Sequence, residues 1–340
     1  MKFLLIRFSS LGDCILLCPL ADHLKRAGAE EVTVVTKVAY TALFAAATGV
    51  DRVVAFNPGG GAGGLMRIAA DHRDRGYCVI DAHNNLRSRL LSWRLGGADA
   101  RFRKRYRERL GLILFKREVR LPSIIDQYRA LSDAAGVPAP ALAPGGLDIP
   151  RSWAETAEKA LDDATTWIAI APGARWPSKR WPAGHFVELA SRLARRRGCR
   201  ILLVGDATDR AAAAPVAEEL GDLCVDITGR AELMESAAFI SRCAGFVGND
   251  SGLAHLAEAV GTPAAVLFGP TVEAFGYYPS LPQSKSIERE LSCRPCSRNG
   301  GRPCPKRTLE CLTGIAVDDV EQAIGELLDR TGPARYVVQS

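Results

Sequence analysis

Long apolar runs are missing from this 340-residue sequence, and no stretch reaches the roughly 18 apolar residues that a membrane-spanning helix needs. The first 24 residues contain a lysine and an apolar core, as a signal peptide does, but Arg7 and Asp13 interrupt the apolar run. We therefore expect residues 3–7 to form a first buried strand. The protein is expected to be cytoplasmic and to meet a membrane only at its surface, through charge.

Patterns for nucleic-acid binding and for nicotinamide or flavin binding are also missing. The sequence has no aromatic RNA-binding motif and no recognisable DNA-binding helix pair, so no nucleic acid is expected as a partner. Residues 58–64 contain a literal G-x-G-x-x-G, but they do not follow the first strand and lack the acidic residue about 20 positions further on. We expect a flexible loop there. Because Tyr-x-x-x-Lys is absent too, a nucleotide-sugar epimerase or dehydrogenase is not favoured.

The sequence does have enough apolar material for two cores. Hydrophobic residues make up 47% of the chain, and 340 residues exceed the usual size of one domain. The formal net charge of +6 favours acidic partners. Positive charge is concentrated in residues 101–120, where nine Lys or Arg stand against two Glu. This segment suits an anionic sugar or phosphate headgroups, or else it is a solvated helix face.

Strand-like apolar runs alternate with helical stretches in two series, separated by the Pro/Gly-rich residues 138–150. The predicted strands are residues 3–7, 32–36, 52–56 and 78–81, and then 167–171, 200–204, 224–226, 245–247 and 264–268. This pattern predicts an α/β protein with two doubly wound domains, residues 1–150 and 151–340, that face each other across a cleft. We expect the last helix, residues 317–329, either to stay in the second domain or to cross back to the first.

The segment SSLGD, residues 9–13, directly follows the first predicted strand and precedes a helix. Ser10 and Gly12 would form a turn whose amides face the cleft, and Asp13 would stand at the helix start. A carboxylate there either caps the helix or acts as a general base towards a ligand held by the other domain.

Two segments follow strands of the second series. PGARWPSKRWP, residues 172–182, offers Lys179 and Arg180 as positive charges for a phosphate. The alternative is that this segment is only a surface loop. GDATD, residues 205–209, offers Asp206 or Asp209 to a ribose hydroxyl, although helix capping explains both residues equally well.

A third segment, NDSGLAHLAEAVGTP at residues 249–263, lies between two predicted parallel strands. A helix that opens on Asp250, Ser251 and Gly252 would point unpaired amides and the positive end of its dipole at an anion beyond the strand ends. His255 would lie one turn inside. The alternative is a capped structural helix in which His255 is packed against its neighbours.

Ten cysteines are present, and four of them cluster in one Gly/Pro-rich segment. Their spacing, Cys-x2-Cys-x7-Cys-x6-Cys, is that of ligands which close a tetrahedral shell around zinc or iron. We expect a structural metal rather than a catalytic one, with free or disulfide-linked thiols as the alternative. The predicted ligands are Cys293, Cys296, Cys304 and Cys311.

LIRFSSLGD, PGARWPSKRWP and GNDSGLAHLAEAVGTPAAVLFGPT together make the sequence resemble glycosyltransferase family 9, the ADP-heptose:lipopolysaccharide heptosyltransferases. The motifs stand in family order and the resemblance covers nearly the whole chain. It implies a GT-B fold of two Rossmann-like domains with the donor bound mainly by the second. It also implies an inverting transfer of heptose from ADP-heptose to the Kdo or heptose of the inner core, on an anionic lipid A-Kdo acceptor. No cofactor is implied for catalysis, and the sequence has no Asp-x-Asp that would hold a catalytic metal.

The resemblance also implies residue roles. Asp13 would be the base, and Lys179 would bind the donor diphosphate. The ADP-heptose site would be lined by Asp250, Ser251, Gly252 and His255, and Ser10, Leu11 and Gly12 would shape the loop near the reacting centre. We count Ser10 and Gly12 among the donor-binding residues, together with Asp209, which is assigned from its position after a strand. The division into two domains, and not the resemblance, leads us to expect that the acceptor's negative charge meets Arg87, Arg89 and the basic residues 101–120.

Two alternatives remain open at this point. The chain could be a family member with a different nucleotide-sugar donor or acceptor, since the cysteine cluster is absent from the best-known enteric members. It could also be a sugar-nucleotide or glycolipid binding protein without turnover, although the intact SSLGD motif argues against this.

Overall fold

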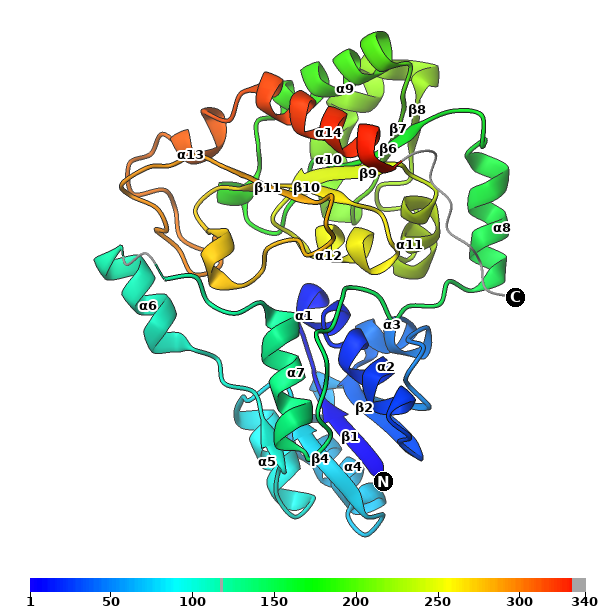
Figure 1. Cartoon of the computed structure of the whole chain (residues 1–340), viewed down its shortest axis with the longest axis vertical. Coiled ribbons are helices and arrows are strands. Elements are labelled where there is room, and N and C mark those ends of the chain that lie inside the picture. The colour runs from blue at the N-terminus through cyan, green and yellow to red at the C-terminus, as the bar shows by residue number, and fades with distance from the viewer. Residues whose placement is uncertain (117–118, 332–340) are drawn as a thin grey trace. The chain divides into compact units, whose positions relative to one another are not determined.

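The chain forms two compact units, which the computed structural model describes for residues 1–116 and 119–331. The first unit comprises Met1–Arg105 and Pro122–Asp148, and the second comprises Tyr106–Leu121 and Ile149–Ser340. Each unit is built on one parallel sheet with helices on both of its faces (Figure 1). None of the helices among the described residues combines the length and the apolar character that spanning a bilayer requires.

The first unit has a five-stranded parallel sheet in the order β3-β2-β1-β4-β5. Helices α2 and α7 pack together on one side of this sheet, and α4 and α5 pack together on the other. Its strands are β1 (Lys2–Ile6), β2 (Glu31–Lys37), β3 (Arg52–Phe56), β4 (Tyr77–Asp81) and β5 (Ala100–Arg101). Its helices are α1 (Leu11–Ile15), α2 (Cys18–Arg26), α3 (Thr41–Ala45), α4 (Gly61–His72), α5 (Leu86–Arg94) and α7 (Ile124–Ala134).

The second unit has a six-stranded parallel sheet in the order β11-β10-β9-β6-β7-β8. Helices α9, α10 and α14 cover one face, and α11 and α12 cover the other, with α8 against α11. Its strands are β6 (Trp167–Ala171), β7 (Arg200–Leu203), β8 (Cys224–Asp226), β9 (Gly245–Asn249), β10 (Ala264–Phe268) and β11 (Lys285–Glu288). Its helices are α6 (Tyr106–Phe115), α8 (Arg151–Ala160), α9 (Ala183–Arg197), α10 (Arg210–Leu220), α11 (Leu233–Ser241), α12 (Gly252–Ala259), α13 (Glu310–Thr313) and α14 (Val317–Thr331).

The central strands read as continuous apolar runs because helices cover both faces of each sheet. All five residues of β6 and of β10 are buried. The two Rossmann-like parallel units that the sequence predicts are therefore confirmed, and each of the nine predicted strands is present to within two residues at either end. The predicted cleft between the domains and the return of the last helix stay predictions.

Three details of the fold differ from the prediction. Strand β5 has only two residues, and β11 is a partly polar edge strand, so neither produces an apolar run in the sequence. Residues 58–64 are not a flexible loop, because a short 3-10 turn at Pro58–Gly60 leads into α4 at Gly61. Part of the basic segment 101–120 belongs to the second unit, since Tyr106–Leu121 is grouped there. Residues 117 and 118 of that segment lie outside the described residues.

Candidate functional site

In each sheet the strand order reverses at one point, so that successive strands are added on one side of this point first and on the other side afterwards. In the first sheet this point lies between β1 and β4, and in the second between β6 and β9. Beyond the carboxyl ends of such strand pairs, the loops separate and leave a crevice in which ligands bind. The sequence motifs SSLGD and NDSG follow β1 and β9, so both lie at these points.

Asp13 is a buried carboxylate in the first unit, on the short helix α1 that follows β1. Its Oδ2 forms an ion pair of 2.6 Å with Nη2 of Arg7. The same oxygen accepts hydrogen bonds from the hydroxyl of Ser10 at 2.7 Å and from the Ser10 backbone N–H at 3.2 Å. These contacts stabilise the carboxylate anion, which is the form that a general base needs. The helix-capping role and the ion pair are therefore present together.

Arg7 fixes this arrangement from the end of β1. It is 5% exposed, its Nη1 donates to the Ala82 carbonyl oxygen after β4 at 2.6 Å, and its guanidinium lies 6.0 Å from the ring centre of Tyr128. His83 follows Ala82, and its pKa is lowered to about 3 by burial and by the nearby Arg7 charge. A cation and a neutral imidazole thus stand beside the Asp13 carboxylate at the β1/β4 switch point.

Arg87 and Arg89 lie in the first turn of α5, which follows β4, and both side chains are exposed. Asn85 caps this helix by accepting from the Ser88 N–H at 2.9 Å. Nε of Arg89 donates to Oδ1 of Asn84 at 2.9 Å. Both guanidinium groups are therefore accessible to an anionic ligand, and their role as acceptor contacts stays a prediction.

Helix α12 begins at the β9 end of the second switch point with an unusual cap. Ser251 is the N-cap residue, yet it makes no side-chain cap hydrogen bond, and its Oγ is buried without a hydrogen-bond partner among the described residues. The Asp250 carboxylate does not cap the helix either, because it is drawn to Lys179 and to the Thr271 hydroxyl. No side chain thus occupies the cap position, in which an anion can bind.

Lys179 and Asp250 form a buried ion pair of 2.5 Å between Nζ and Oδ2. Nζ also donates to the Asp250 carbonyl oxygen at 3.1 Å, so two of the three ammonium N–H groups are used here. Burial by itself would raise the pKa of Asp250, but the Lys179 charge and the hydrogen bonds from Lys179 and Thr271 outweigh it and lower the pKa. Asp250 therefore stays ionised and holds the ammonium group at the start of α12.

Asn249, the last residue of β9, holds the loop of Lys179 in place. It is completely buried, and its Nδ2 donates to the carbonyl oxygens of Pro172 and Gly173 at 2.9 and 3.0 Å. Its Oδ1 accepts from the Trp181 N–H at 2.9 Å. One amide side chain thereby ties both ends of the 172–181 loop to the strand that precedes Asp250.

Asp209 lies in the loop after β7, where it completes a capping box with Asp206. Burial raises the pKa of Asp209, and Arg180 is 3.8 Å from its Oδ1. Gly173 packs so closely that a Cβ there would be 2.0 Å from the Asp209 carboxylate. The carboxylate is thus held next to the 172–181 loop, and its contact with a ribose stays a prediction.

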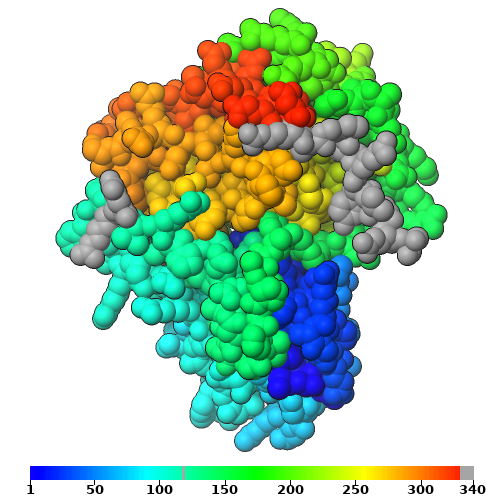
Figure 2. All heavy atoms as spheres, in the orientation of Figure 1, coloured from blue at the N-terminus to red at the C-terminus, as the bar shows by residue number. Residues whose placement is uncertain are grey.

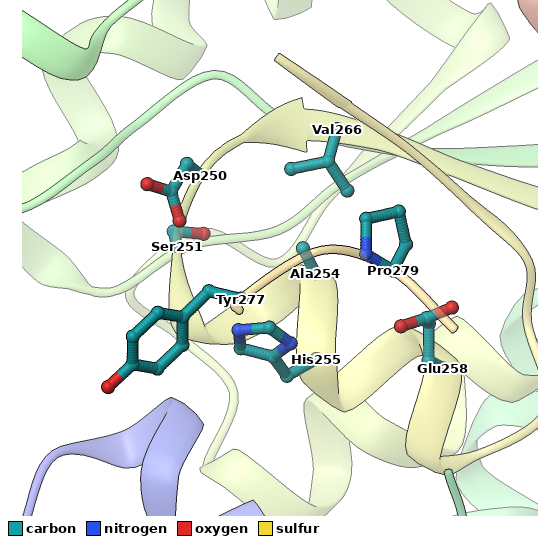
Figure 3. Close-up of a pocket in the computed structure, with 8 residues that line it drawn as sticks. All are labelled: Asp250, Ser251, Ala254, His255, Glu258, Val266, Tyr277 and Pro279. Carbon is teal, nitrogen blue, oxygen red and sulfur yellow. The ribbon is translucent and has the colours of Figure 1, made fainter. Parts of the chain in front are cut away.

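A narrow pocket of about 190 Å³ lies along α12, lined by Asp250, Ser251, Ala254, His255, Glu258, Val266, Tyr277 and Pro279 (Figure 3). The rings of His255 and Tyr277 are neighbours, with their centres 6.1 Å apart. Glu258 anchors the opposite wall, because its carboxylate accepts from the backbone N–H groups of Ser280 and Leu281. The free space inside it is too narrow to admit a water molecule. The side chains along α12 therefore leave no cavity for a sugar in this structure, and the pocket marks only the wall beside the helix start.

Several of these residues were not among those predicted from the sequence. Tyr277 carries no recognisable signal, whereas Asn249 opens the NDSG segment but was given no role. Arg7 and His83 do carry one, since Arg7 ends the first predicted strand and His83 lies two residues beyond the fourth, and these positions at strand ends could have identified them.

The predicted metal site at Cys293, Cys296, Cys304 and Cys311 is wrong. Within residues 1–116 and 119–331, no group of three or more His, Cys, Asp or Glu side chains is placed so that it could hold a metal ion. All four cysteines are free, and burial raises the pKa of the Cys311 thiol to about 11, whereas metal binding needs the thiolate. The spacing brings the cysteines into one region but does not by itself set the directions of the sulfur atoms.

Comparison with known proteins agrees with this geometry. The protein family described as "Glycosyltransferase family 9 (heptosyltransferase)" matches residues 72–306 of the chain. Lipooligosaccharide heptosyltransferase 2 of Haemophilus influenzae is 34% identical over 183 residues, which are 49% of this chain and 52% of that protein. The chain thus spans about half the length of the curated relatives it matches.

Solved structures with the same fold include the following two. A family 9 glycosyl transferase from Veillonella parvula superposes with a TM-score of 0.78 at 22% identity, over 96% of this chain and 97% of its own. The Escherichia coli ADP-heptose lipopolysaccharide heptosyltransferase II superposes with a TM-score of 0.75 at 24% identity, over 97% and 99%. At these identities the likeness establishes the fold alone. Since the family match covers well over half of the chain and includes parts of both units, the chain belongs to glycosyltransferase family 9.

Proposed function

We propose that this protein is an inverting glycosyltransferase that moves heptose from ADP-heptose to the Kdo or heptose of a lipopolysaccharide inner core, without a catalytic metal. The observation that supports this most directly is the start of α12. There the cap position is left without a side chain, and a buried ammonium group stands beside it. Such a site suits the diphosphate of a nucleotide sugar. The curated relatives are heptosyltransferases, which favours heptose as the sugar.

The reaction assigns a separate task to each unit. Asp13 accepts the proton of the acceptor hydroxyl while the hydroxyl oxygen forms a bond to the anomeric carbon of the donor sugar. The bond from that carbon to the diphosphate breaks on the opposite face, so the configuration inverts and ADP leaves with the electron pair. The amides of the first turn of α12 and the third N–H of Lys179 stabilise the negative charge that develops on the diphosphate.

The acceptor is proposed to be an anionic glycolipid, reached from the cytoplasmic side at the membrane surface. Arg87 and Arg89 are exposed guanidinium groups on the first unit and would bind its phosphates or carboxylates. A lipid-anchored acceptor requires the enzyme to work at a bilayer even though none of the described helices is able to span one.

Release of nucleoside diphosphate tests the proposal. Purified protein is incubated with ADP-heptose, GDP-mannose or UDP-glucose and a Kdo-lipid acceptor, with and without a chelator. We expect ADP release from ADP-heptose only, at a rate that the chelator does not change, and a product of inverted anomeric configuration by NMR. Another preferred donor would reassign the substrate, and donor binding without turnover would indicate a binding protein.

The base is tested with Asp13→Asn, which keeps the side-chain size but removes the proton acceptor. We expect turnover to fall by about a hundredfold or more, because general base catalysis contributes on the order of 10² to 10⁴. Donor affinity should be unchanged, since Asp13 belongs to the first unit and the donor is assigned to the second. Full turnover by Asp13→Asn would disprove the assignment of the base.

A further inference from the structure

One face of helix α6 packs against the rest of the second unit, to which the helix belongs. Leu112 is buried with Leu121, Val272 and Phe275 in a small apolar cluster. Lys116, just after the helix, donates from Nζ to the carbonyl oxygens of Cys293 and Pro295 at 3.0 and 2.7 Å. These contacts hold α6 in place and so determine which of its residues face outward.

The outward face of α6 and its continuation are apolar. Ten large hydrophobic side chains are exposed among the described residues, and half of them lie between residues 106 and 119. Their exposed fractions are Tyr106 50%, Leu110 52%, Leu114 61%, Phe115 68% and Val119 50%. The first three are spaced four residues apart and therefore form one stripe along the helix. Clustered exposure of this kind marks a surface that binds something.

Basic side chains lie beside this stripe. Arg107 is exposed and has no ion-pair partner among the described residues. The Arg298 guanidinium lies 5.1 Å from the ring centre of Tyr106, which brings the exposed end of a second segment to the helix. That segment, residues 298–307, contains four basic residues and no acidic one. Figure 2 shows the blue-green atoms of α6 at the surface beside the orange atoms of the 270–310 region.

We propose that this surface, formed by residues 106–116, 119–121 and 298–307 and here called the α6 surface, docks onto an anionic phospholipid bilayer. The apolar stripe would enter the boundary between headgroups and acyl chains, and the basic residues would meet the lipid phosphates. Tyr106 is suited to the headgroup level, because its ring is apolar and its hydroxyl is polar. Phe115 is suited to the apolar face of an interfacial helix. The proposal adds a defined docking surface to the proposed function, in which the acceptor is a glycolipid.

Charge argues for a bilayer rather than for a second copy of the chain. In a symmetric pair the same patch lies on both sides of the interface. Arg107 and the basic residues 298–307 would then face their own equivalents, and like charges at an interface oppose association. An anionic lipid surface provides the complementary charge for Arg107 and for the basic residues 298–307.

Sedimentation with lipid vesicles tests the α6 surface, using the full chain. Vesicles of phosphatidylcholine alone are compared with vesicles in which about a third of the lipid is phosphatidylglycerol. We expect binding to the anionic vesicles only, and weaker binding as the salt concentration rises. Leu110→Ser with Leu114→Ser should weaken binding about tenfold, since both side chains would lose their apolar contact. Arg107→Glu should weaken it by at least about fivefold.

The matched control is Leu223→Ser, which removes an exposed leucine elsewhere on the same unit and should bind as the unmodified protein does. Equal binding to both vesicle types, or unchanged binding by the leucine pair variant, would overturn the proposal. A protein that self-associates in size-exclusion chromatography and loses this with the pair variant, without vesicle binding, would identify a second copy as the occupant.

Turnover with a water-soluble, delipidated acceptor separates this proposal from the proposed function. The pair variant should retain that turnover, because none of its residues is assigned to the reaction. Normal turnover without vesicle binding would overturn only the α6 surface. Vesicle binding without turnover would overturn only the transferase assignment.

Discussion

Removing the Lys179 ammonium group should destabilise the second unit strongly. Its Nζ is 2.5 Å from Oδ2 of Asp250, and each side chain is only 13% exposed. At an effective dielectric constant of about 20, this separation corresponds to an attraction of about 7 kcal/mol before desolvation is subtracted. Loss of one partner from a buried pair costs about 3–5 kcal/mol, because the remaining charge stays buried without compensation. We expect Lys179→Met to lower the free energy of unfolding by this amount.

Methionine is chosen because it keeps an unbranched stem. The lysine stem packs on Gly300, where a Cβ would be 2.7 Å from the lysine Cγ, so a branched replacement would disturb the loop as well. Urea unfolding followed by tryptophan fluorescence suits the measurement, since four of the five tryptophans belong to the second unit. Asp250→Asn in the Lys179→Met background should restore part of the loss, because it removes the unpaired charge.

The pH dependence supplies an independent check with a definite sign. In the unmodified protein the pKa of Asp250 is lowered, so its stabilisation is complete above the unfolded pKa of about 3.9 and is lost as the pH falls through the folded pKa. In the Lys179→Met variant burial dominates, and the pKa of Asp250 should be raised. The variant is then most stable below the unfolded pKa of Asp250, and its stability falls as the pH rises. The difference between the two proteins should therefore shrink between pH 7 and pH 4. A loss below about 1 kcal/mol that does not change with pH would refute a buried pair.

Three further predictions concern other parts of the chain. Gly173→Ala should lower the free energy of unfolding by about 1–3 kcal/mol, measured by urea unfolding, because the new Cβ would be 2.0 Å from the Asp209 carboxylate; an unchanged value would show that this approach is not close. The His83 ring should keep the NMR shifts of neutral imidazole down to about pH 4, because its pKa is lowered to about 3. The contribution of neutral His83 to stability is complete above the usual histidine pKa of about 6.5 and is lost as the pH falls towards 3. Titration of the ring near pH 6.5 would contradict this. Cys14 and Cys18 should resist maleimide at pH 7.5 in native protein and react after denaturation, as measured by mass spectrometry. Burial raises the pKa of the Cys14 thiol to about 12 and raises that of Cys18 as well, so neither forms the reactive thiolate. Labelling of native protein would show that the two thiols are accessible.

Sequence patterns predicted most of the fold because parallel strands covered on both faces must be apolar throughout. The runs at Trp167–Ala171 and Ala264–Phe268 are strands with these bounds. Helix α9 ends where the sequence offers a glycine, with Gly198 in the left-handed conformation after Arg197. Where tertiary contacts outweigh local pattern, prediction failed: β11 is partly polar and depends on pairing with β10, and α4 begins within a run of glycines.

The site shows the same division. The sequence identified which loops follow which strands, and thereby placed Asp13, Lys179 and Asp250 beyond strand ends. It did not reveal that Arg7 pairs with Asp13 or that Lys179 pairs with Asp250. Each pair forms only when the folded chain brings the two side chains together. It also predicted a metal site from cysteine spacing, which says nothing about the directions of the sulfur atoms.

The amino-acid sequence by itself determined the two α/β units, the order of their strands along the chain and the motifs at the strand ends. These depend on hydrophobic periodicity and on local turn chemistry, which act over a few residues. Only the tertiary structure decided that the cap of α12 is left without a side chain, because the Asp250 carboxylate is drawn to Lys179, 71 positions earlier in the chain. It also decided which face of α6 remains exposed, since that depends on contacts with residues 272–295.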